Sequence, residues 1–93
     1  MQITVLRRLA LDDLSERYIG TRLGPCQSFA EGDVFYTQGY DKPEGFCSAA
    51  WDAIGKLAAV LAMGGLAYGR KANVACCNDG VRPVIFLLEA VDN

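Results

Sequence analysis

Histidine is absent from the 93-residue chain, which excludes serine–histidine and cysteine–histidine catalysis and every histidine-ligated metal site. A basic stripe is missing too, because the nine lysines and arginines are scattered and only Arg7–Arg8 and Arg70–Lys71 are adjacent. Nucleic-acid-binding domains usually carry such a stripe, and the net charge here is −2. We therefore expect no nucleic-acid partner.

Long apolar segments are also missing. No signal-peptide core is present in the first ten residues, MQITVLRRLA, and the apolar run after Lys56 is shorter than the roughly 20 residues that a membrane-spanning helix needs. We therefore expect a cytoplasmic protein with no membrane partner. In that compartment the four cysteines are thiols or metal ligands rather than disulfides.

Apolar residues nevertheless make up 52% of the chain, enough for the core of a single domain over 1–93. Alternation, helix-capping spacing and turn residues predict the elements along the chain. These are a strand over 2–8, a helix from Asp13 to Gly20, a strand over 34–38, a long helix over about 47–64, and strands over 72–77 and 82–91. We interpret this order, β-α-β-α-β-β, as an α+β two-layer sandwich, with the long helix packed across a mostly antiparallel sheet.

Two segments of this sandwich are unusually apolar. The last strand is apolar on both faces, which suits a central position in the sheet. The long helix has one polar stripe, Ser48, Asp52 and Lys56, and is then apolar on every side over 57–63. Such a helix ends buried, in the core or against another chain. We therefore expect a homo-oligomer that forms through the apolar helix end, 57–68.

Four thiols without histidine favour a metal site held by thiolates alone, either zinc or an iron–sulfur cluster, with Cys26, Cys47, Cys76 and Cys77 as ligands. Zinc ribbons and ferredoxins pair cysteines two residues apart, and no such pair is present. If the strand continues to Cys77, only one of Cys76 and Cys77 joins Cys26 and Cys47, because strand neighbours face opposite sides. All four converge only if the chain leaves strand geometry at Cys77. The alternative for either of the adjacent cysteines is a small core residue.

A second interpretation is a thiol-dependent enzyme or redox protein. Cys47 lies near the N-terminus of the long helix, whose dipole favours a thiolate. Cys47 is then the reactive sulfur, a second cysteine resolves it, and Arg82 binds a small anionic ligand. Asp79 flanks the same hairpin tip as Arg82, although an aspartate in such a turn usually bonds its own backbone. The third interpretation is an assembly module with structural cysteines.

Five short motifs punctuate the chain: Gly24-Pro25-Cys26, Phe29-x-Glu31-Gly32-x-x-Phe35, Pro43-Glu44-Gly45-Phe46-Cys47 with Ala50-Trp51, Gly64-Gly65, and Ala75-Cys76-Cys77-x-Asp79-Gly80-x-Arg82-Pro83-Val84. Together they resemble a family of small, functionally uncharacterised prokaryotic proteins of about this length that is frequent in anaerobes. The resemblance covers nearly the whole chain and departs from the family at Ser48, where the motif has proline, and in a short loop after Gly65. It implies that the cysteine motifs and the turn before Pro83 are the family signature, and it transfers no activity.

Overall fold

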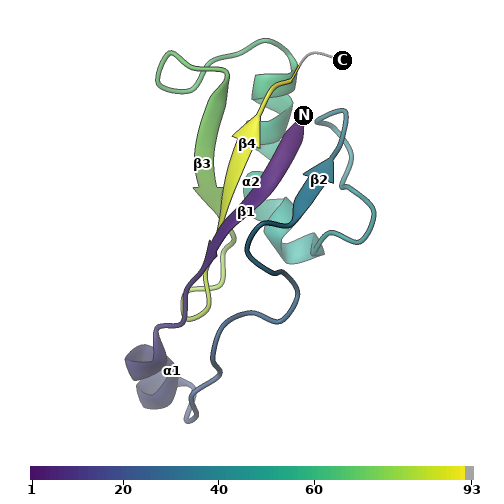
Figure 1. The fold of residues 1–93 in the computed structure, drawn as a ribbon. Helices are drawn as coiled ribbons and strands as arrows, with labels where there is room; N and C mark the ends of the chain where they lie inside the picture. The colour runs from purple at the N-terminus through teal and green to yellow at the C-terminus, as the bar shows by residue number, and fades with distance from the viewer. Residues whose placement is uncertain (92–93) are drawn as a thin grey trace.

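The computed structural model describes residues 1–91 and has one long helix lying across one face of a four-stranded sheet (Figure 1). The elements in chain order are β1 (Gln2–Arg8), α1 (Asp12–Tyr18), β2 (Val34–Tyr36), α2 (Ser48–Ala62), β3 (Ala72–Cys76) and β4 (Val84–Glu89). The expected α+β class is confirmed. Within the same residues, no helix is long and apolar enough to cross a membrane.

The sheet has the strand order β2-β1-β4-β3, and every neighbouring pair is antiparallel. β4 is therefore an interior strand, as its apolar pattern predicts. Alternate residues of β4 are buried on the side of α2, namely Val84, Phe86 and Leu88. Ile85 and Leu87 point to the other side, because strand neighbours face opposite ways.

The core lies between the sheet and α2. The helix contributes a stripe of buried residues spaced three or four apart, Ala50, Ile54, Ala58 and Leu61. Three aromatic rings close the core near the start of the helix: the centroid of Phe46 lies 5.0 Å from that of Phe29 and 5.4 Å from that of Phe86. This packing fixes the N-terminal end of α2 against the sheet.

The C-terminal end of α2 is covered only on this stripe. Val60 and Met63 belong to the segment that the sequence shows as apolar all round, and they are 48% and 75% exposed. The helix ends where the two-glycine segment predicts, because Gly64 adopts a φ of 88°, a left-handed conformation that favours glycine. Apolar surface therefore remains uncovered at this end of the helix.

The first helix differs from the expectation in two ways. Figure 1 places α1 beyond the end of the sheet, so α2 alone forms the helix layer. The N-cap of α1 is Leu11 rather than Asp13. The reason is that the backbone N–H of Leu11 still donates to the carbonyl of Val81 at 2.9 Å, so strand-like pairing continues up to the helix start.

Three strands are shorter than expected, and β3 ends at Cys76 rather than at 77. β2 ends at Tyr36 rather than at 38, because the next hydroxyl, that of Thr37, accepts the N–H of Gly39 at 3.1 Å and turns the chain. β4 begins at Val84 rather than at 82, and the connection from β3 spans 77–83 instead of a tight turn. The side chain of Asp79 organises this longer loop, and the loop borders the candidate site.

Candidate functional site

Three of the four cysteines line one cavity of about 200 Å³ where α2 begins. Cys26 comes from the loop before β2, Cys47 from the start of α2, and Cys77 from the position just after β3. Asp79 and Arg82 line the same cavity. The fold thus brings together three thiols from separate segments and both of the predicted charged candidates.

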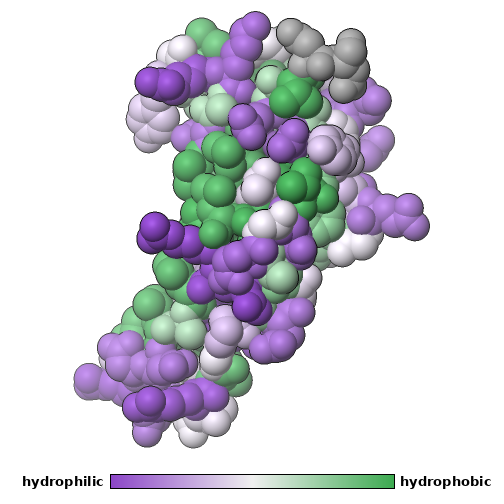
Figure 2. All heavy atoms as spheres, in the orientation of Figure 1, coloured by the Kyte–Doolittle hydropathy of each residue, from purple (hydrophilic) through white to green (hydrophobic). Residues whose placement is uncertain are grey.

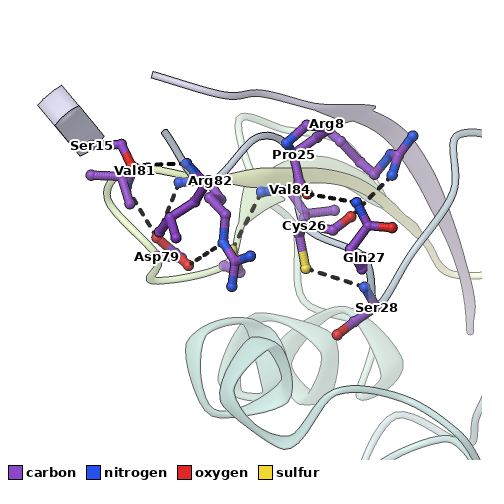
Figure 3. A network of polar contacts seen from close by, with 12 residues as sticks. Arg8, Ser15, Pro25, Cys26, Gln27, Ser28, Asp79, Val81, Arg82 and Val84 are labelled. Carbon is purple, nitrogen blue, oxygen red and sulfur yellow. Dashed lines mark hydrogen bonds and ion pairs between the residues drawn. The ribbon is translucent and has the colours of Figure 1, made fainter. Parts of the chain in front are cut away.

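Cys26 is positioned by its backbone as well as its sulfur. The guanidinium Nη1 of Arg8 donates to the carbonyl of Cys26 at 3.0 Å, and the same arginine forms an ion pair with Glu31, Nε to Oε2, at 3.0 Å. The backbone N–H of Ser28 points at the Cys26 sulfur at 3.4 Å. Figure 3 shows this sulfur directed from the loop toward α2. Arg8 therefore ties the Cys26 loop to the end of β1.

Cys47 is the N-cap of α2, because its carbonyl accepts the N–H of Trp51 at 3.0 Å. Within residues 1–91 no hydrogen bond reaches the Cys47 sulfur, whereas the sulfurs of Cys26 and Cys77 each accept a backbone N–H. The positive end of the helix dipole lies at this residue. Cys47 is thus the half-buried thiol that is least engaged by its surroundings.

Lys42 adds a positive charge beside Cys47, and sequence reasoning missed it. Its ammonium donates to the carbonyl of Phe46 at 3.0 Å and to the hydroxyl of Ser48 at 3.3 Å, the two residues on either side of the cysteine. The sequence of the loop before α2 has no pattern that predicts these contacts of Lys42. Only the turn of the chain at Pro43 in the folded structure brings Lys42 back to the start of α2.

The adjacent cysteines of β3 separate. Cys76 is the last residue of the strand, lies opposite Ile85 and is exposed on the face away from α2. Cys77 is half-buried and lines the cavity, and its sulfur accepts the N–H of Val84 at 3.3 Å. Of the two geometries considered from sequence, the structure has the one in which only one of the pair joins Cys26 and Cys47.

Asp79 and Arg82, which both line the cavity, form one hydrogen-bonded unit (Figure 3). One carboxylate oxygen of Asp79 accepts the N–H groups of Val81 and Arg82, both at 3.0 Å, and the other accepts Nε of Arg82 at 3.4 Å. The two terminal nitrogens of the Arg82 guanidinium make no hydrogen bond to the described residues. Asp79 therefore fixes the loop and orients Arg82.

The carboxylate of Asp79 is held ionised by these bonds. Partial burial is the largest single influence and raises the pKa of Asp79. The two backbone N–H groups and the Arg82 guanidinium together outweigh burial, so the pKa lies below its ordinary value of 3.8. Asp79 is thus negatively charged at neutral pH and suited to positioning Arg82.

A metal centre would need three or more ligating side chains within reach of one ion. Among residues 1–91, no group of three histidine, cysteine, aspartate or glutamate side chains meets that requirement. The three cavity thiols share a cavity without forming a closed ligand set, and Cys76 lies outside it. All four cysteines are free.

Comparison with known proteins adds no assignment to this geometry. No protein-family model, no curated protein and no solved structure matches the chain. The resemblance in the cysteine motifs therefore stays a prediction.

Proposed function

We propose that the cavity performs thiol–disulfide exchange with a small disulfide that carries a negative charge. The observation that carries this proposal is that Cys26, Cys47 and Cys77 line one cavity together with Arg82, whose two terminal nitrogens bond none of the described residues. Free thiols in a shared cavity suit a reducing compartment such as the cytoplasm. The alternative of three unrelated core cysteines does not explain why both Arg82 and Asp79 line the same cavity as the thiols.

The proposed exchange has two steps. The Cys47 thiolate attacks one sulfur of the small disulfide, forming a mixed disulfide while the other half leaves as a thiolate. A second cavity thiol, Cys26 or Cys77, then gives up its proton and attacks the Cys47 sulfur, releasing the remaining half. Two protein thiols are oxidised to one disulfide, and the small disulfide is reduced to two thiols, so two electrons pass to the substrate.

Charge determines which disulfides are favoured. Arg82 provides a planar guanidinium that binds a carboxylate or a similar anion through its free nitrogens. The ammonium of Lys42 and the N-terminus of α2 place further positive potential at Cys47. The proposal therefore predicts that an anionic disulfide reacts faster than a neutral one at the same thiol.

The decisive experiment compares two chromogenic disulfides on the reduced protein, namely 5,5′-dithiobis(2-nitrobenzoate), which is anionic, and 4,4′-dithiodipyridine, which is neutral. Cys47→Ser should abolish the fast phase with both probes, and peptide mapping should locate the first adduct on Cys47. Arg82→Gln should slow the anionic probe by about tenfold, the equivalent of one charge-assisted contact, and leave the neutral probe nearly unchanged.

Arg22→Gln is the matched control, because Arg22 is exposed and pairs with Glu16 away from the cavity. It should leave both rates unchanged. Four thiols that react at similar slow rates would sink the proposal, and so would a first adduct on Cys76. If Arg82→Gln slows both probes equally, the proposed preference for an anionic disulfide is wrong.

The second candidate is a metal or iron–sulfur site with Cys26, Cys47 and Cys77 as ligands and one open position. It is favoured by the same cavity, because three thiolates are a known partial ligand set. The side chains as placed do not form that set, so binding would need them to move together. Elemental analysis of protein purified under nitrogen tests it: stoichiometric zinc or iron that is lost in Cys77→Ser but kept in Cys76→Ser would favour this function over exchange.

A further inference from the structure

The face of the sheet turned away from α2 has no element covering it among residues 1–91. Figure 1 looks onto this open face, with α2 behind the strands and α1 beyond their end. Figure 2 shows hydrophobic residues gathered over the middle of the same face, between hydrophilic groups above and below. In an antiparallel sheet with one solvated face, the outward positions are normally polar.

A row of four residues crosses the middle of this open face. The registers place Val34 beside Thr4, Thr4 beside Leu87, and Leu87 beside Val74, one residue from each strand. Val34 is 42% and Val74 54% exposed. Ile85 lies one row below Leu87 on β4, so the apolar character of that strand continues on a side that the fold leaves uncovered.

Opposite charges lie at the two ends of the open face. Arg7 is paired with Ile85 at one end, and Glu89 is paired with Gln2 at the other. They are four residues of β4 apart, or about 13 Å at the usual rise of a strand. Neither side chain has an ion-pair partner within the part of the chain that the structure describes.

We propose that two copies of the chain pair face to face through this open face. A two-fold axis along the row of Leu87 brings that row onto the same row of the second copy. Because the axis reverses the strand direction, Arg7 comes within reach of the partner's Glu89, and the same contact forms a second time by symmetry. The apolar row is then covered, and both unpaired charges gain partners.

The size of the face sets the expected strength. Four strands about 4.8 Å apart and about five residues long present a planar area of about 300 Å². This is less than the roughly 800 Å² that each partner buries in a standard interface, so we expect a weak dimer with a dissociation constant of about 100 µM. The apolar end of α2, with Val60 and Met63, is the competing surface that the sequence predicts, but it offers no complementary charges of its own.

The test measures self-association by sedimentation velocity from 1 to 500 µM protein under reducing conditions. Leu87→Lys places two lysines at the two-fold axis and should weaken the dimer at least about 100-fold. Arg7→Glu should weaken it by about tenfold or more, because two like-charge contacts replace two attractive ones. The swapped variant Arg7→Glu with Glu89→Arg should return the dissociation constant to within about threefold of the original.

Met63→Lys is the matched control on the exposed end of α2 and should leave the dimer unchanged. Circular dichroism and a thermal melt of each variant establish that it is folded. A wild-type chain that stays monomeric at 500 µM overturns the proposal, as does dissociation by Met63→Lys with Leu87→Lys silent. Failure of the charge swap to restore pairing overturns the geometry. None of these readouts depends on the cavity thiols, so the result is separate from that of thiol exchange.

Discussion

The two faces of the sheet are made by the same strands but carry different kinds of residues. The covered face holds the aromatic core and, at one end, the cavity with three thiols. The open face holds a row that is apolar except for Thr4, and one charge lies at each end of the face. Two pairs of sequence neighbours divide between the faces: Arg8 and Cys77 belong to the covered side, and Arg7 and Cys76 to the open side.

This division shows that residue type alone does not assign a role in so small a sheet. Arg8 is engaged by Glu31 and by the carbonyl of Cys26, whereas Arg7 has no partner in the described part of the chain. The difference arises from strand alternation, because one step along β1 reverses the face. Substitutions at two adjacent positions of one strand should therefore change the stability of the monomer by very different amounts.

The largest contrast is expected at Phe86 and Leu87. Phe86 is fully buried and contacts the rings of Phe29 and Phe46, so Phe86→Ala should destabilise the chain by about 3–5 kcal/mol. Leu87→Ala removes a side chain from the open face and should cost under about 1 kcal/mol. Urea unfolding at about 1 µM protein, where the proposed dimer dissociates, measures both. Equal losses would mean that the open face is covered in the monomer.

The next contrast is between the adjacent arginines. Arg8→Ala removes an ion pair and the bond to the Cys26 carbonyl and should cost about 1–2 kcal/mol, because Arg8 is only 24% exposed. Arg7→Ala should change monomer stability by less than about 0.5 kcal/mol. The same urea titration measures both, and Arg8→Lys should restore little, since lysine lacks the planar fork. A costly Arg7→Ala would place Arg7 in an intramolecular contact.

Much of the framework was predictable from periodicity and turn residues. The strands β1 and β3, the interior place of β4 and the extent of α2 follow from apolar patterns that packing then reinforces. The boundaries failed where side chains bond the backbone. Thr37 ended β2 early, and Asp79 delayed β4, because local hydrogen bonds competed with the sheet ladder.

The candidate site was predictable in its residues and not in its arrangement. The sequence named Cys26, Cys47, Asp79 and Arg82, and all four line the cavity. It left Cys76 and Cys77 undecided, since the choice depended on where β3 ends. Lys42 was missed because its contact with the start of α2 is made by a turn in space, which no spacing along the chain encodes.

A smaller contrast is expected at the adjacent cysteines. Cys77→Ala leaves the N–H of Val84 without its sulfur acceptor and removes a side chain packed against the core, at a cost of about 1 kcal/mol. Cys76→Ala should be close to neutral, because Cys76 is exposed on the open face. Thermal unfolding in a reducing buffer measures the pair. A destabilising Cys76→Ala with a neutral Cys77→Ala would reverse the assignment of the two faces.

The smallest effect expected is an acid dependence confined to the cavity side. The pKa of Asp79 is lower in the folded chain than its ordinary value of 3.8, so the stability that it contributes is present above that pH and is lost as the pH falls below it. The contribution should stay under about 1 kcal/mol, because solvent screens a carboxylate that is 39% exposed. Asp79→Asn should therefore flatten the fall in stability between about pH 4 and pH 2 measured by urea unfolding, while Asp52→Asn on the exposed side of α2 should not. If Asp79→Asn leaves the fall in stability at low pH unchanged, the acid dependence does not come from Asp79, and Glu31 is the next candidate. The pKa of Glu31 is lowered by its own backbone N–H and then by Arg8, despite a smaller opposing effect of desolvation.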